Sequence, residues 1–288
     1  MSSPHQQDHF GAGPGFGDGG PRFAFPTITP VVKRLVIANA AVYLLTLLLT
    51  LVGVGHGVLL DALGLSRGVW ATLAPFLPIW QLGTYSFMHD ITPGHVLMNM
   101  LGLYFFGTMV ESTIGSARFI VHYLIAVMLG GLAFLLKEVA TDGNAYLVGA
   151  SGGMLAMIVA AAVFEPNRMV IFLLFPVPLK WLAGGLVAYD LIYGALSWRA
   201  SVDGMAQTGG TAYIVHLVGA AYGFLAVRQR WIWFDPVQRF KVRRAIADEE
   251  KRHTEAQRMD ALLEKIHKEG INSLDRGERD FLKRVSRR

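Results

Sequence analysis

Six apolar segments dominate the middle of this chain. A helix needs roughly 20 apolar residues to cross a bilayer, and fewer where it ends inside protein. The segments cover residues 35–54, 95–110, 118–136, 151–164, 179–196 and 211–227. Because lipid offers the backbone no hydrogen-bond partners, apolar segments of this kind fold as helices. We therefore expect an all-α fold, a polytopic membrane helical bundle with six transmembrane helices.

The composition agrees with a membrane location and excludes several kinds of site. Hydrophobic residues make up 53% of the chain and charged residues 16%, whereas soluble domains carry about a quarter charged residues. More than half of the Lys and Arg side chains lie beyond residue 230, so the net charge of +5 gives little support to nucleic-acid binding. The chain has no Cys, which excludes disulfides, thiolate metal sites and a Cys nucleophile. His95 and His216 lack a third ligand at suggestive spacing, so we expect no metal and no cofactor.

The chain divides into three parts by composition. Residues 1–30 are rich in Gly, Pro, His and Gln, which predicts a disordered cytoplasmic tail. Residues 31–230 hold the six segments, and residues 231–288 are strongly charged, which predicts a cytoplasmic helical tail domain. In this last part, apolar residues at helical spacing run up to Gly270, and Ser273 is predicted to cap a final helix. Adhesion to the membrane surface, binding of a cytoplasmic partner and a solvated stabilising role fit this tail equally.

Basic residues predict which way the bundle faces. Six segments place both ends of the chain on one side of the membrane. The basic residues on that side are Lys33, Arg34, Arg118, Arg168, Lys180, Arg228 and Arg230, against Arg67, Lys137 and Arg199 on the other. The positive-inside rule therefore predicts that both termini are cytoplasmic. The second, fourth and sixth segments then run from the outer face to the inner face.

Polar residues from three of these segments are predicted to meet near the outer face. His95 and Asn99 lie in the first turns of the second segment, and Ser151 opens the fourth. His216 is five residues into the sixth, roughly 8 Å below the start of the helix at 1.5 Å per residue. Polar side chains inside a membrane cost free energy and mark a functional site by default.

These residues suit acyl transfer. Ser151 is a candidate nucleophile and His216 its general base. The backbone N–H groups at a helix start are unpaired within the helix and can stabilise a developing oxyanion. His95 and Asn99 are one helical turn apart and could add side-chain donors to the same oxyanion.

Glycines flank the candidate catalytic residues. Gly149 lets the loop backbone approach closely, and Gly152 leaves room for a substrate backbone beside the hydroxyl of Ser151. Gly219 and Gly223 place small residues on one face of the sixth segment, so that another helix can pack closely there. Each feature alone also has an ordinary structural explanation: a Ser in a helix often bonds a carbonyl one turn back. Their shared depth favours the catalytic interpretation.

The motifs together resemble the rhomboid intramembrane serine proteases. They are His95-x-x-x-Asn99, Gly149-Ala150-Ser151-Gly152 and His216-x-x-Gly219-x-x-x-Gly223, in the family's order within about residues 30–230. The resemblance implies a dyad of Ser151 and His216 without a third acid. It also implies an oxyanion hole formed by the Ser151 N–H, His95 and Asn99.

Some positions depart from the family pattern. Gln81 stands where an Arg often follows Trp, within an apolar stretch, residues 70–87, that is interrupted by prolines and predicts a membrane-dipping loop. Leu155 stands where an aromatic ring often stacks on the catalytic His, and Val215 where Ala often precedes it. Asp190, in the fifth segment, could pair across helices or be a helix-bonding residue with no catalytic part, and we expect the latter.

The resemblance implies a serine endopeptidase that cleaves single-span membrane proteins in or near the outer half of their span. We expect it in the lipid bilayer of a bacterial inner (plasma) membrane, with the active site open to the outer face. The alternative is a non-catalytic relative that binds or displaces transmembrane segments. A transporter would show repeated halves and charged pathways, and the sequence has neither.

Overall fold

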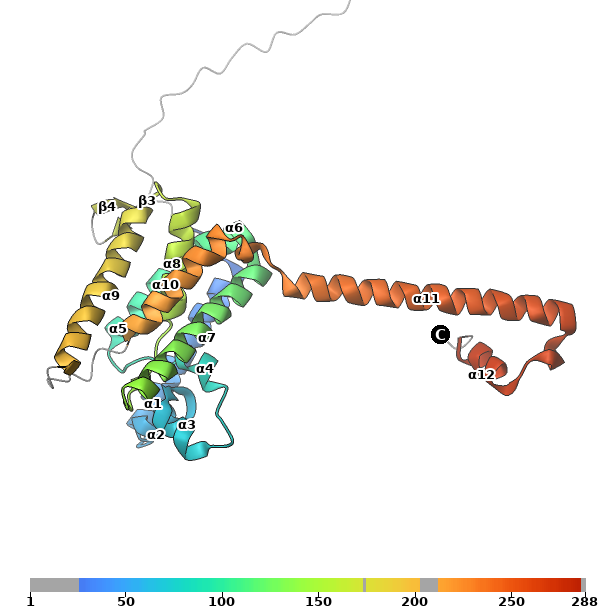
Figure 1. Ribbon diagram of the computed structural model, residues 1–288, viewed down its shortest axis with the longest axis horizontal. Coiled ribbons are helices and arrows are strands. Elements are labelled where there is room, and N and C mark those ends of the chain that lie inside the picture. The colour runs from blue at the N-terminus through green and yellow to red at the C-terminus, as the bar shows by residue number, and fades with distance from the viewer. Residues whose placement is uncertain (1–25, 173–174, 203–211, 286–288) are drawn as a thin grey trace, which may run out of the picture.

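The protein is a helical bundle from which one long helix projects (Figure 1). The computed structural model describes residues 26–172, 175–202 and 212–285, so the predicted disordered segment 1–30 lies almost wholly outside the described residues. The main helices of the bundle are α1 (Pro30–Leu51), α5 (Pro93–Gly102), α6 (Thr108–Ile114), α7 (Ser116–Ala140), α8 (Ser151–Phe164), α9 (Leu179–Val202) and α10 (Ala212–Arg228). Every described part of the predicted segments is thus essentially helical, and the all-α membrane bundle is confirmed.

Burial separates the inside of the bundle from its outer helices. α8 is buried along most of its length, and α7 buries the rings of Phe119, Tyr123 and Phe134. By contrast, large apolar side chains on α1 and α9 are exposed, as expected where a helix faces lipid. Among the described residues, α1 and α7 are the two helices long and apolar enough to cross a membrane by length and composition.

The second apolar segment is longer than its predicted bounds. A single π-helical turn, η2 (Leu103–Gly107), joins α5 to α6, so helix continues from residue 93 to residue 114. Gly102 allows a close approach here, because a Cβ at that position would lie 2.1 Å from the Met154 sulfur on α8. The second apolar segment is therefore packed directly against α8.

A buried carboxylate closes the start of α1. Glu111, 2% exposed, accepts hydrogen bonds from the backbone N–H groups of Val31 (3.0 Å) and Val32 (2.9 Å). It also accepts from the hydroxyl groups of Thr29 and Ser116. The first N–H groups of a helix have no partner within the helix, so this carboxylate satisfies them and ties α1 to the turn between α6 and α7.

The first loop is built from short helices. It contains α2 (His56–Leu63), α3 (Arg67–Leu73), α4 (Gln81–Thr84) and η1 (Tyr85–Phe87). Gln81 is buried, accepts from the Trp70 indole N–H (3.1 Å) and donates to the Asp61 carbonyl (2.7 Å). The amide that departs from the family pattern therefore holds this loop together by hydrogen bonds.

Two small antiparallel strand pairs were not predicted. β1 (Leu65–Ser66) pairs with β2 (Tyr146–Leu147), with Leu65 opposite Leu147. β3 (Met169–Phe172) pairs with β4 (Phe175–Pro178) between α8 and α9. The first pair ties the loop before α8 to the first loop, which helps to place Ser151.

The C-terminal tail forms a helical hairpin. The 3₁₀ turn η3 (Trp231–Trp233) follows α10, then α11 (Pro236–Glu269) leaves the bundle and α12 (Arg276–Val285) folds back beside its far end (Figure 1). Leu262, Leu274 and Phe281 form a small buried cluster between them.

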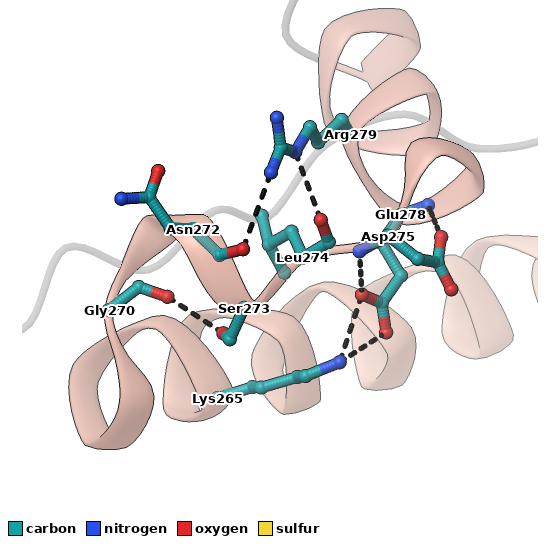
Figure 2. Close-up of polar contacts among 8 residues, drawn as sticks. All are labelled: Lys265, Gly270, Asn272, Ser273, Leu274, Asp275, Glu278 and Arg279. Atoms are coloured by element: carbon teal, nitrogen blue, oxygen red, sulfur yellow. Dashed lines mark hydrogen bonds and ion pairs between the residues drawn. The ribbon is translucent and has the colours of Figure 1, made fainter.

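The predicted cap of the last helix is wrong. Ser273 lies in η4 (Ile271–Ser273) and donates to the Gly270 carbonyl (2.7 Å), whereas Asp275 caps α12 by accepting from the amide of Glu278 (2.7 Å). Glu278 reciprocates to the amide of Asp275 (2.8 Å) and binds Lys265 (3.0 Å), as Figure 2 shows. The amide of Asp275 and the Lys265 ammonium lower the pKa of Glu278. Asp275 and Glu278 thus form a capping box.

Helices α8 and α10 touch backbone to backbone. A Cβ at Gly219 would lie 2.2 Å from the Gly152 carbonyl oxygen, and one at Gly223 would lie 2.2 Å from that of Ala156. The predicted small face of the sixth segment is therefore an interhelical contact that leaves no room for a side chain.

This contact predicts that Gly223→Ala destabilises the bundle. The added methyl must push α10 away from α8, at a cost on the order of 1–3 kcal/mol. Thermal unfolding in detergent micelles measures the effect. The matched control is Gly184→Ala on α9, where an added Cβ meets nothing within 4 Å. Equal melting temperatures for the two variants would contradict this account of the α8–α10 contact.

Candidate active site

Ser151 and His216 meet between α8 and α10. Ser151 is the first residue of α8, and His216 lies in the second turn of α10. The Ser151 Oγ is 2.7 Å from the His216 Nε2. The contact follows from the glycine packing, since Gly219 lies three residues after His216 and touches Gly152, the residue after Ser151. The structure therefore brings together the two residues predicted as nucleophile and base.

The loop before Ser151 requires glycine. Gly149 has φ +110°, a conformation that side chains disfavour, and its amide donates to the Tyr85 carbonyl (3.0 Å). A Cβ at this position would lie 2.7 Å from the His95 Nε2 and 3.8 Å from the Asn99 Nδ2. The close approach predicted for Gly149 is thus against α5.

His95 and Asn99 lie beside this loop, as predicted. Asn99 is 2% exposed, and its Nδ2 donates to the His95 carbonyl (2.9 Å). The ring of His95 faces Asp90. The backbone amide nitrogen of Asp90 lies 3.4 Å from the Nδ1 of His95. The Ala150 carbonyl accepts from the amide of Met154 (2.9 Å), so the Ser151 amide precedes the first bond of the helix. His95 and Asn99 thus lie against Gly149, two residues before Ser151.

Gly152 and Val215 define the packing beside the pair. A Cβ at Gly152 would lie 2.6 Å from the Val215 Cγ1. Gly152 therefore leaves room for the α10 residue that precedes His216, at the position where room for a substrate backbone was predicted. Val215 itself is 1% exposed and fills the contact between α8 and α10.

Asp190 of α9 contacts the other nitrogen of the His216 ring. The His216 Nδ1 lies 3.0 Å from the Asp190 Oδ1, and Asp190 is 7% exposed. Of the two roles considered for Asp190, the structure shows the pairing across helices, and the partner is the candidate base. The resemblance implies a dyad without a third acid, whereas the structure places a carboxylate at the second nitrogen of the candidate base. A carboxylate in an apolar helix is costly, so the sequence alone marks Asp190 as a residue that needs a partner. The spacing of residues along the chain could not identify that partner as His216.

The site contains no cluster suited to a metal among the described residues. No group of three or more His, Asp or Glu side chains is placed to hold an ion there. The ring of His216 keeps 23% of its surface exposed and that of His95 29%. Both histidine rings are therefore partly accessible. The 2.7 Å contact between Ser151 and His216 is short enough for a proton to pass between them.

The fold and site define a helical integral membrane protein with a serine–histidine pair between two of its helices. A family model for the Rhomboid domain matches residues 78–231, more than half of the chain, so the chain belongs to the rhomboid family. The matched range includes Ser151, His216, His95 and Asn99. A second model, for a family of unknown function, matches residues 248–288 of the tail.

Curated relatives are similar over part of their length. "Rhomboid protein 1, mitochondrial" of Saccharomyces cerevisiae is 29% identical over 135 residues, 46% of this chain and 36% of that protein. "RHOMBOID-like protein 12, mitochondrial" of Arabidopsis thaliana is 29% identical over 199 residues, 63% of this chain and 55% of that protein. "Presenilin-associated rhomboid-like protein A, mitochondrial" of Danio rerio is 28% identical over 129 residues, 43% and 33% of the two chains. The matches therefore span about a third to just over half of these relatives.

Proposed function

We propose that this protein is an intramembrane serine endopeptidase. The observation that supports it most directly is the 2.7 Å contact between the Ser151 Oγ and the His216 Nε2 at the start of a buried helix. Membership of the rhomboid family supports the same reaction class. The presence of both groups in hydrogen-bonding contact argues against the non-catalytic alternative.

The proposed reaction passes through an acyl-enzyme. The His216 Nε2 takes the Ser151 hydroxyl proton as Oγ attacks the scissile carbonyl. The Ser151 amide, His95 and Asn99 stabilise the oxyanion, with Gly149 and Gly152 shaping the space around it. His216 then gives the proton to the leaving amine. Finally, His216 activates a water that hydrolyses the ester and frees Ser151.

The proposed substrates are single-span membrane proteins cut in or near the outer half of their span. A peptide bond in an intact helix is shielded by its own side chains, so the substrate must unwind locally to reach Ser151. We further propose six spans, cytoplasmic termini and a site open to the outer face, supported by the distribution of basic residues.

The proposed location is a bacterial inner (plasma) membrane. The tail resembles the short C-terminal domain that follows some bacterial rhomboids, which supports this location. The mitochondrial names belong to the relatives. We divide the chain into a terminal segment, residues 1–30, a six-span protease domain, residues 31–230, and a helical tail domain, residues 231–288. The tail is free of the bundle along most of α11, so it could meet the membrane surface or a cytoplasmic partner.

Ser151→Ala should abolish cleavage while leaving the fold intact. The purified protein, reconstituted into liposomes, is incubated with a panel of single-span substrates, and mass spectrometry identifies the products. The expected loss is at least about 10³-fold, because no other nucleophile replaces the hydroxyl. Cleavage at the wild-type rate by a folded Ser151→Ala variant would rule out this mechanism.

Asn99→Ala should lower kcat more than it raises KM. Removing one oxyanion donor typically costs about 10²–10³ in kcat, because the oxyanion exists only after the attack. Steady-state kinetics on the best substrate of the panel measures both constants. Met98→Ala is the matched control, since Met98 lies on the same helix and is 57% exposed. An Asn99→Ala enzyme with unchanged kcat would remove this residue from the oxyanion hole.

A further inference from the structure

Three helices meet at the ring of His216. Its Nε2 lies 2.7 Å from Ser151 of α8, and its Nδ1 lies 3.0 Å from the carboxylate of Asp190 on α9. The two contacts use opposite sides of one ring, so the ring bridges the serine and the acid. The Asp190 side chain keeps 9% of its surface exposed.

The packing of α9 explains how the acid reaches the ring. Gly194 lies one helical turn after Asp190, and a Cβ there would lie 2.6 Å from the ring of Tyr213. Tyr213 in turn precedes His216 by three residues, on the same side of α10. The missing side chain at Gly194 therefore lets α9 and α10 approach at the level of the Asp190–His216 contact.

The neighbours of Asp190 face the other way. Tyr189, Leu191 and Ile192 are 65%, 56% and 63% exposed, whereas Asp190 is 7% exposed. A charged carboxylate removed from water is costly unless it is paired and hydrogen-bonded. The side chains next to Asp190 on α9 point outward, whereas Asp190 points inward at the His216 ring. The contact with the ring therefore supplies the partner that a buried carboxylate needs.

We propose that Asp190 is the positioning residue of the catalytic histidine; the proposal rests on the proposed protease function. A carboxylate only accepts hydrogen bonds, so it holds the proton of the neutral imidazole on Nδ1. The Nε2 is then free to accept the proton of the Ser151 hydroxyl. When that proton moves from Oγ to Nε2, the ring becomes positive and the carboxylate stabilises it at close range.

As the positioning residue of His216, Asp190 must do two things that a purely structural contact need not do. The carboxylate has to fix the ring tautomer before substrate binds, and it has to stabilise a charge that exists only during the reaction. Its removal should therefore act on kcat rather than on KM. A residue that merely links α9 to α10 would change stability and substrate binding together.

The kinetic test compares two variants at position 190 with a control variant at position 189. Asp190→Asn should lower kcat by about 10²–10⁴ with KM within about threefold, since the amide can present an N–H to the ring and favour the wrong tautomer. Asp190→Glu, which keeps a carboxylate, should recover at least about tenfold of that loss. Tyr189→Phe, on the exposed side of α9, is the control and should cleave like the wild type. An Asp190→Asn enzyme within about threefold of the wild-type kcat would overturn the proposal, as would equal losses in the Asn and Glu variants.

A second measurement does not depend on cleavage. Nuclear magnetic resonance of protein labelled with ¹⁵N-histidine, in the Ser151→Ala background, should show a strongly downfield proton bound to the Nδ1 of His216. His216→Gln assigns the signal, and Asp190→Asn should remove or markedly shift it. An unchanged signal in Asp190→Asn would overturn the proposal even if the enzyme is active. If no substrate is cleaved but the signal behaves as expected, the protease assignment fails while Asp190 still holds the ring.

Discussion

The structure depends on the backbone contact between α8 and α10. Gly219 and Gly223 have no side chains to separate the two helices, and the carbonyl groups of Gly152 and Ala156 occupy the space instead. Ser151 is the first residue of α8, and His216 lies about one turn before Gly219 on α10. The same helix contact therefore sets the distance between Ser151 and His216. A stable apolar packing arrangement and the position of two polar groups are therefore one feature of the fold.

Several polar groups inside this apolar bundle are paired with one another. The hydroxyl of Ser151 meets His216, the ring of His216 meets Asp190, and Glu111 closes the N-terminus of α1. An unpaired polar group in such surroundings costs free energy, so these contacts stabilise the bundle as well as the site. The carboxylate at His216 also offers another way to hold a ring that has Leu155, not an aromatic residue, at the position where the family often stacks one.

Much of this arrangement could be predicted from the sequence. The apolar segments predicted the helices, and the depth inferred from them predicted that Ser151, His216, His95 and Asn99 lie in one layer; the structure places Ser151 against His216, and His95 and Asn99 against the loop before Ser151. Gly219 and Gly223 predicted a close helix contact, and the structure gives its partner as α8. These features succeed because they depend on local periodicity and on the length of a helix that crosses a membrane.

The rest depends on contacts between distant segments. The partner of Asp190 follows from how α9 rotates and approaches α10 at Gly194, which no spacing along the chain encodes. The pairing of β1 with β2 joins residues about 80 positions apart, and two-residue strands leave no periodic signal. At the last helix, both Ser273 and Asp275 are good caps by type, and the reciprocal bond with Glu278 decides between them.

The most direct test of the central claim is covalent labelling of the folded protein with a fluorophosphonate. An activated serine attacks phosphorus and expels fluoride, which leaves one stable adduct that peptide mass spectrometry can locate. The account predicts a single adduct on Ser151, formed at least about tenfold more slowly in His216→Ala, because the general base is then absent. No adduct on the folded wild-type protein, or an adduct elsewhere with Ser151 unmodified, would contradict it.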